Sequence, residues 1–143
     1  MPGIEIPEHV LDAMIAQARA EAPVEACGIL AGTGARVEKL YTMTNADGSS
    51  DHFMMLPEEQ FAVVKKMRSA GLKMLAIYHS HPQTPARPSQ EDIRLALTPD
   101  VTHVILSLQD AARPVVKGFR IDDGHVTQIE VRAARHCARR QMR

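Results

Sequence analysis

Met74-Leu75-Ala76-Ile77-Tyr78-His79-Ser80-His81-Pro82 is the stretch of this sequence that decides its fold. Its first five residues form a short apolar run soon after Gly71, which indicates a buried β-strand. Side chains two residues apart on a strand face the same way, with about 6.6–6.8 Å between their Cα atoms. We therefore expect His79 and His81 to project from one face at the end of this strand.

A carboxylate follows the two histidines at a useful spacing. Ten residues separate His81 from Asp92, enough for a loop that returns one carboxylate to two imidazoles. Two histidines and one carboxylate leave the fourth tetrahedral position of a zinc ion to water, as in catalytic rather than structural zinc sites. The pKa of water bound in this way is about 7. The pattern therefore favours hydrolytic chemistry at neutral pH.

These residues also carry a family resemblance. The His-x-His pair, the spacing to Asp92 and the position of Ser89 three residues before it resemble the JAMM metallopeptidase family, also called JAB or MPN. That family uses an upstream glutamate, for which the candidate here is Glu25. The resemblance extends from about residue 4 to residue 131, and it implies a three-layer α/β fold similar to that of cytidine deaminases.

The resemblance implies a role for each of five residues. One Zn²⁺ per chain would be held by His79, His81 and Asp92. Glu25 would act as general base and then as general acid, taking a proton from water and returning it to the leaving amine. The hydroxyl of Ser89 would donate a hydrogen bond to the developing oxyanion.

Each of these residues also has a purely structural interpretation. The two histidines could be polar side chains at a strand end, and Glu25 could be exposed at a sheet edge. Ser89 could cap the following helix, which is worth about 1 kcal/mol. Asp92 could be a first-turn acid stabilised by the amide dipoles of that helix. The joint spacing of all five favours the catalytic interpretation.

Cys27 lies two residues after Glu25, so its side chain is expected to face the same way. A fourth zinc ligand, a redox switch and a small buried hydrophobic residue are the three alternatives, and the last is favoured. The other histidines have no partners at metal-binding spacing and are assigned to the surface or to packing. They are His9, His52, His103, His125 and His136.

Composition narrows the class of protein. The 143 residues are 45% hydrophobic, which predicts one folded domain with its own core. From residue 132 the chain has five arginines and no acid, whereas residues 1–131 hold 12 Lys and Arg against 17 Asp and Glu, a net charge of about −5. We therefore expect a domain at 1–131 and a basic tail at 132–143. Only 3% of the residues are aromatic, which argues against nucleic-acid binding.

The expected location is the cytoplasm. The sequence lacks a signal-peptide pattern and an apolar run of about 20 residues that could span a membrane. Its two cysteines, Cys27 and Cys137, lie far apart and predict no disulfide framework. The basic tail is interpreted either as a solvated end or as a docking arm for an acidic partner.

Periodicity and turn residues predict a mixed sheet flanked by helices. One helix is expected from Pro7 to about Ala20, and a second from Pro57 to Gly71 with Phe61, Val64 and Met67 facing inward. A third helix follows Ser89. Strands are expected at residues 4–6, 25–31, 36–43, 53–55, 74–81, 102–108, 115–121 and 126–131, with the second and third forming a hairpin.

Several further segments make the chain similar to one bacterial branch of the family, which releases cysteine from the C-terminus of a ubiquitin-like sulfur-carrier protein. They are residues 25–32, 43–46, 78–81 and 120–124, whereas Pro82-Gln83-Thr84-Pro85 departs from that branch. The sequence-based prediction is thus a zinc hydrolase of such amide bonds. The alternatives are a deubiquitinase-like isopeptidase, a peptidase with other substrates, a non-catalytic MPN scaffold and a zinc protein that only binds. The sequence leaves open whether the chain forms a homodimer.

Overall fold

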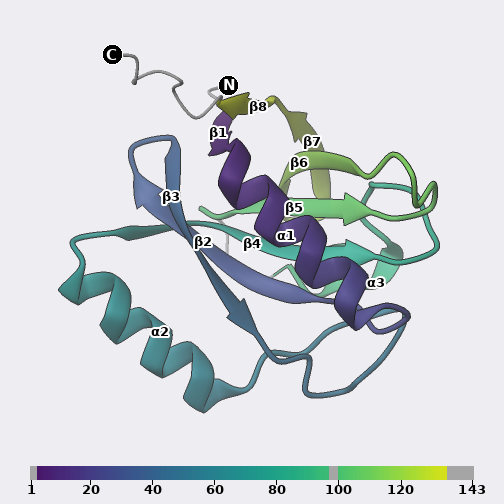
Figure 1. Cartoon of the computed structure of the whole chain (residues 1–143), viewed down its shortest axis with the longest axis horizontal. Helices are drawn as coiled ribbons and strands as arrows, with labels where there is room; N and C mark the ends of the chain where they lie inside the picture. Colours follow the sequence, from purple (N-terminus) through teal and green to yellow (C-terminus); the bar gives the residue numbers. More distant parts are fainter. Residues whose placement is uncertain (1–2, 97–99, 135–143) are drawn as a thin grey trace.

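The computed structural model describes residues 3–96 and 100–134 as one eight-stranded mixed sheet with three helices (Figure 1). The strand order is β7-β6-β5-β4-β2-β3-β1-β8. The elements in chain order are β1 Ile4–Pro7, α1 Glu8–Glu21, β2 Cys27–Thr33, β3 Arg36–Met43, α2 Pro57–Ser69, β4 Lys73–His81, α3 Gln90–Arg94, β5 Thr102–Ser107, β6 Val115–Asp122, β7 His125–Ile129 and β8 Val131–Ala134. The predicted α/β class is confirmed.

Two apolar cores on opposite faces of the sheet give the three layers. Successive residues of a strand point to opposite faces, and β2 divides its side chains accordingly. Leu30 packs with α1 in one core, which also contains Tyr78 of β4. Ile29 packs in a second core with Val63 and Met67 of α2. The sheet therefore lies between α1 and α2 (Figure 1).

The apolar stripe predicted for the first helix is confirmed. Val10, Met14 and Ala18 are spaced four residues apart and are buried against the sheet, as a repeat of 3.6 residues per turn requires. The Tyr78 hydroxyl donates a hydrogen bond to the Met14 carbonyl at 3.1 Å. This buried bond fixes α1 directly over the strand that carries the histidines.

The prediction for the second helix is partly wrong, because Phe61 does not face inward. Its side chain is 67% exposed, and the Lys65 ammonium lies 5.2 Å from the centre of its ring. The buried stripe of α2 is formed by Val63 and Met67. Two residues advance a helix by about 200°, so Phe61 lies on the side opposite Val63.

The strand predicted at residues 53–55 is reduced to an isolated antiparallel bridge between Asn45 and Met55. The side chain of Asn45 takes the place of a second strand: its Oδ1 accepts hydrogen bonds from the backbone N–H groups of Asp47 and Met54, each at 3.2 Å. A side chain that pairs with backbone groups in this way offers the chain an alternative to a ladder.

The stretch predicted as one strand at residues 126–131 is divided at Glu130 into two strands. β7 pairs with β6, whereas β8 pairs in parallel with β1 at the far end of the sheet. Figure 1 shows β1 and β8 side by side. The strand β8 continues past residue 131, so residues 132–134 of the predicted tail belong to the sheet. Residues 135–143, which include His136 and Cys137, lie outside the described residues.

None of the helices in residues 3–96 and 100–134 is long and apolar enough to cross a membrane.

Candidate metal centre

His79 and His81 occupy the end of β4 and face the same way, as predicted. β4 is an interior strand, paired with β2 on one side and β5 on the other. Both imidazoles are consequently buried, with exposed residue fractions of 2% and 4%. Their rings are 4.9 Å apart between centroids, so the strand alternation brings them together as a pair.

Asp92 reaches the histidines from the first turn of α3. Ser89 is the N-cap of this helix: its Oγ accepts from the Asp92 N–H at 3.0 Å, and its own N–H donates to Asp92 Oδ2 at 2.9 Å. This reciprocal pair is a capping box. The predicted cap is therefore confirmed, and it holds the Asp92 carboxylate toward the strand end.

The loop between the histidines and α3 is fixed by two hydrogen bonds. The His81 Nδ1 atom lies 2.8 Å from the Pro85 carbonyl oxygen. The Ser107 hydroxyl at the end of β5 donates to the Thr84 carbonyl at 2.6 Å. Three prolines in this loop limit its conformations, so Asp92 is returned to the histidines along a constrained path.

Three ligand atoms converge at this point. The Nε2 atoms of His79 and His81 are 3.1 Å apart, and Asp92 Oδ2 lies 3.2 Å from the first and 3.1 Å from the second. Tetrahedral ligands bonded to zinc at 2.0–2.1 Å are about 3.3–3.4 Å from one another. The near-equilateral triangle matches that spacing. Among residues 3–96 and 100–134, His79, His81 and Asp92 form the one group of side chains whose ligand atoms lie close enough together to hold a metal ion.

The chemistry of the donors also fits a cation. A carbonyl oxygen only accepts hydrogen bonds, so in neutral His81 the proton is on the Nδ1 that faces Pro85. Its Nε2 lone pair then points toward Asp92 Oδ2, a second electron-rich atom. Such an arrangement is repulsive unless a proton or a metal ion lies between the donors. The residues present therefore fit a zinc ion.

Interactions within this cluster shift the pKa values of Asp92 and His81. Burial alone would raise the pKa of Asp92, but hydrogen bonds from His79 and His81 outweigh it and hold the pKa well below its usual range. Burial disfavours the charged form of His81, yet the bond with Asp92 raises its pKa above the ordinary value. Asp92 is thus a carboxylate at neutral pH, the form that a metal requires.

Glu25 lies two residues before β2 begins and is 2% exposed. The structure thus corrects the prediction that it opens a strand, and it excludes the alternative of an exposed edge. Burial raises its pKa from 4.5 to about 8; His81 opposes this rise, while Asp92 adds to it. Its Oε1 is buried and has no hydrogen-bond partner among the described residues. A carboxyl group with this pKa and a free lone pair is suited to proton transfer near pH 7.

Ser89 is able to serve two roles. In the cap its Oγ accepts a hydrogen bond from the Asp92 N–H. A hydroxyl has one hydrogen to donate as well as two lone pairs, so capping leaves its hydrogen available. The structural and catalytic interpretations of Ser89 are therefore compatible.

Cys27 is a buried packing residue. It belongs to the core under α2 and its Sγ lies 3.8 Å from the Met43 carbonyl oxygen. Burial raises the pKa of its thiol, so the thiolate that metals bind is disfavoured. It is also outside the metal-binding group. The favoured interpretation is confirmed.

A cavity of about 370 Å³ opens beside His79 and Asp92. The Phe53 ring stacks on the His79 imidazole with 4.8 Å between centroids and 24° between planes. The cavity wall is mostly apolar and is lined by His52, Phe53, Met54, Met55, Pro57, Gln60, Ile77, His79, Glu91, Asp92, Leu95 and His103. Its volume is within the range of small-molecule sites.

The sequence assigns His52 and His103 to the surface or to packing, yet both line this cavity. His52 is held by Asp51 at 2.9 Å and Asp47 at 3.0 Å, and these contacts raise its pKa. Burial and the neighbouring His79 lower the pKa of His103, whose β5 position pairs with Ile77 of β4. The sequence also does not reveal that Phe53 stacks on His79, because a single aromatic residue in a loop gives no periodic signal.

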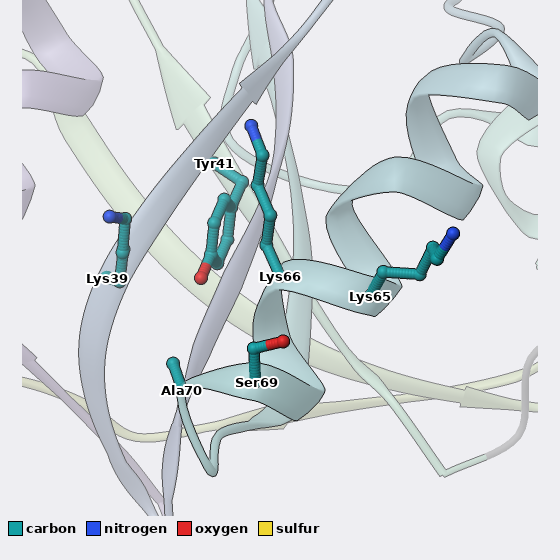
Figure 2. A pocket seen from close by; sticks show the side chains of 6 residues that line it. All are labelled: Lys39, Tyr41, Lys65, Lys66, Ser69 and Ala70. Carbon is teal, nitrogen blue, oxygen red and sulfur yellow. The ribbon is translucent and has the colours of Figure 1, made fainter.

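A second hollow, of about 450 Å³, lies between β3 and the end of α2. Figure 2 shows its lining side chains: Lys39, Tyr41, Lys65, Lys66, Ser69 and Ala70. This lining contains neither a carboxylate nor a histidine. The hollow therefore offers no counterpart to the ligand triangle.

The fold and the triangle together describe an α/β domain with a candidate three-ligand metal centre at one strand end. The chain belongs to the family described as prokaryotic homologs of the JAB domain, whose model matches residues 7–122. It is 40% identical over 124 residues to a CysO-cysteine peptidase of Mycobacterium tuberculosis, with 85% of each chain covered. It is 36% identical over 92 residues to a probable TtuB-protein conjugate cleaving protease of Thermus thermophilus, covering 64% of this chain and 62% of that one.

Solved structures share the fold. A solution structure of a Desulfitobacterium hafniense protein superposes with a TM-score of 0.86 at 42% identity, covering 94% of this chain and 95% of the other. A crystal structure of a JAB1/MPN domain protein from Archaeoglobus fulgidus gives a TM-score of 0.60 at 21% identity, covering 92% and 99%. The predicted JAB/MPN architecture is thereby confirmed.

Proposed function

We propose that this protein is a zinc-dependent hydrolase that cleaves an amide bond at the C-terminus of a ubiquitin-like protein, releasing cysteine from a sulfur-carrier protein. One observation carries the proposal: three ligand atoms lie within 3.2 Å of one another, and the buried Glu25 carboxyl group interacts electrostatically with His81 and Asp92 among them. A scaffold that only binds would not need this carboxyl group.

His79, His81 and Asp92 would hold one zinc ion per chain. Zinc bound there supplies a Lewis acid and makes water acidic enough to act near pH 7. The Pro85 carbonyl and the Ser89 N–H orient two of the ligands, His81 and Asp92. Such outer contacts fix the donor atoms before the metal binds.

Glu25 would move the proton. As a carboxylate it accepts a proton from the attacking water, and it then delivers that proton to the nitrogen of the leaving amine. The water oxygen bonds to the carbonyl carbon, the C–N bond breaks, and one water is consumed for each amide cleaved. The Ser89 hydroxyl donates to the carbonyl oxygen as negative charge develops on it.

The cavity beside His79 would take the leaving amino acid. A carrier ending in Gly-Gly has no side chain to occupy an apolar space of about 370 Å³. Its extended tail suits a narrow groove with backbone hydrogen bonds. A cysteine side chain fits against the apolar wall formed by Phe53, Met55 and Ile77.

The similarity to a CysO-cysteine peptidase over 85% of each chain supports the sulfur-carrier substrate and a role in cysteine biosynthesis. The unpaired, buried Cys27 is compatible with the proposed cytoplasmic location. Sedimentation would show whether the chain forms a homodimer, which its sequence leaves open.

The second candidate is an isopeptidase acting on protein conjugates. The similarity to a probable TtuB-protein conjugate cleaving protease favours it. Its substrate would carry a lysine-linked protein in place of free cysteine. The same residues would perform the chemistry, so the two candidates differ only in the leaving group.

Mass spectrometry of a carrier–cysteine conjugate tests the proposal. Incubation with the enzyme should remove one cysteine residue, and a chelator should stop this while added zinc restores it. Replacing the final glycine of the carrier with valine should slow cleavage strongly, because the branched side chain meets the groove wall. If the conjugate stays intact while a lysine-linked conjugate is cut, the isopeptidase is the correct assignment.

A further inference from the structure

The backbone of Glu25 is held by a loop and not by the sheet. Glu25 precedes β2, so neither of its peptide groups belongs to the strand ladder. Its N–H donates to the Ser49 carbonyl at 2.8 Å, and its carbonyl accepts from Asn45 Nδ2 at 3.1 Å. The position of the Glu25 side chain therefore depends on residues 45–49.

Asn45 is the centre of that loop. Its side-chain amide also lies 3.0 Å from the His52 carbonyl oxygen and 3.4 Å from the Ser49 carbonyl oxygen. Its Oδ1 accepts from the N–H groups of Asp47 and Met54. The residue is only 8% exposed, so one buried amide organises the loop and joins it to Glu25.

The next residue is held from the opposite side by the ligand strand. Ser80, between the two histidines, accepts the Ala26 N–H on its Oγ at 2.8 Å and donates its own N–H to the Ala26 carbonyl at 2.9 Å. Ala26 is thus fixed to the strand of the ligands, while Glu25 is fixed to the loop. The bonds to Ser49 and Asn45 therefore restrict how Glu25 rotates about this junction.

We propose that Asn45 is a positioning residue for proton transfer, which orients Glu25 relative to His79, His81 and Asp92. This inference rests on the proposed hydrolase function. Asn45 acts through the Glu25 backbone and through the loop that places Phe53 on His79. Small displacements of a catalytic group cost much in rate, about 100-fold for 1 Å. Loss of the Asn45 amide should therefore lower kcat while the metal and the substrate still bind.

The test compares Asn45→Ala and Asn45→Asp with Thr44→Ala in the zinc-loaded enzyme acting on the carrier–cysteine conjugate. Asn45→Asp keeps the acceptor for Asp47 and Met54 but loses the donor to Glu25. Thr44→Ala is the matched control, because Thr44 precedes Asn45 in the chain but is exposed, and its hydroxyl bonds Glu59 of α2 at 2.7 Å. We expect both Asn45 variants to lose about 10- to 100-fold in kcat with KM changed little, and the control to stay within about twofold.

A double-mutant cycle separates positioning from general destabilisation. If Asn45 acts through Glu25, Asn45→Ala should cost much less in a Glu25→Gln background than in the wild type. Additive losses would overturn the proposal, as would wild-type kcat in Asn45→Asp or a loss that follows zinc content alone. If Asn45→Ala fails to fold, the cycle is run with Asn45→Asp. An inactive wild-type enzyme would instead refute the proposed function.

Discussion

Two of the hollows formed by the described residues have similar volumes and different chemistry. The one beside α2, lined by Lys39, Lys65 and Lys66, measures about 450 Å³ (Figure 2). The one beside His79 and Asp92 measures about 370 Å³. The larger hollow has three flexible ammonium groups, whereas the smaller one borders buried donors that converge on a point.

The comparison shows that buried donor atoms converging on one point define a metal site better than the volume of a hollow does. His79, His81 and Asp92 come from a strand end and a capped helix, so their positions are fixed by backbone structure. Lysine side chains lose rotamer freedom when they bind, and their charges are screened in solvent. Five predictions test this contrast, beginning with the largest effect.

Removing any one ligand should abolish activity. His79→Ala, His81→Ala and Asp92→Ala are each expected to lose bound zinc and hydrolysis together, because two donors hold zinc poorly. The fold should persist, since the two apolar cores under α1 and α2 do not include these residues. Metal analysis and circular dichroism test this; full zinc occupancy in all three variants would rule out the site.

Removing the proton carrier should be the next largest effect. Glu25→Gln keeps the three ligands, so zinc content should match the wild type. Hydrolysis should fall by about 10²–10⁴-fold, the usual contribution of general acid–base catalysis. Steady-state kinetics at saturating zinc tests this, and wild-type turnover in the variant would show that Glu25 is not the base.

Glu25→Gln should lower hydrolysis but should raise the free energy of unfolding relative to the wild type as the pH rises. The folded-state pKa of Glu25 is about 8 against an ordinary value of 4.5, so the folded chain binds more protons than the unfolded chain between these pH values. The contribution of Glu25 to the free energy of unfolding should therefore be largest below pH 4.5 and should fall as the pH rises toward 8. The two pKa values differ by about 3.5, so at about 1.4 kcal/mol per pKa unit the loss is expected to be on the order of 5 kcal/mol.

Urea unfolding of the metal-free protein at several pH values measures this effect. The raised pKa of His81 acts in the same direction, so the informative quantity is the difference between the wild type and Glu25→Gln. The variant should become relatively more stable as the pH rises. Parallel curves would mean that Glu25 titrates normally.

Removing the stacked ring should have a moderate effect. Phe53→Leu keeps an apolar cavity wall but loses the stack on His79. An aromatic pair of this kind is worth about 0.5–1.5 kcal/mol, so zinc affinity or kcat should fall by about tenfold or less. Competition with a chromogenic chelator gives the affinity, and an unchanged value for both quantities would show that the ring is only packing.

Charge removal in the other hollow should have the smallest effect. Lys65→Ala and Lys66→Ala are expected to leave hydrolysis of the conjugate within about twofold of the wild type, as is usual for surface substitutions. A larger loss in KM that disappears at high salt would mean that the carrier protein contacts this side of the molecule.

The ligand geometry could be predicted from sequence because it is local. Alternation on one strand places His79 beside His81, and the capping pattern from Ser89 places Asp92. The resemblance to a family pattern identifies Glu25, yet its strand assignment is wrong, because the Glu25 N–H donates to the Ser49 carbonyl and the Glu25 carbonyl accepts from the Asn45 amide in place of a ladder. Such bonds join distant segments and leave no periodic signal.

Other errors have the same physical origin. The alternation in residues 126–131 continues without a glycine or proline, so it predicts one strand. The actual break at Glu130 is stabilised by a bond from Ile4 N–H to the Glu130 carbonyl, which is a contact across almost the whole chain. The spacing of three between Phe61, Val64 and Met67 predicts an inward Phe61, whereas the buried face of α2 is set by Val63 and Met67, four residues apart.

The pairing of β1 with β8 has a consequence for how the chain is made. Ile4 lies opposite Val131, so β1 leaves the ribosome long before the strand with which it pairs. Until β8 emerges, the outer edge of β1 has unpaired backbone groups, a surface prone to wrong partners. The candidate metal ligands, which all precede residue 93, are synthesised well before that edge is covered. Contacts between such distant residues slow folding, so closure of the sheet should be a late step, after the ligand strand has met β2.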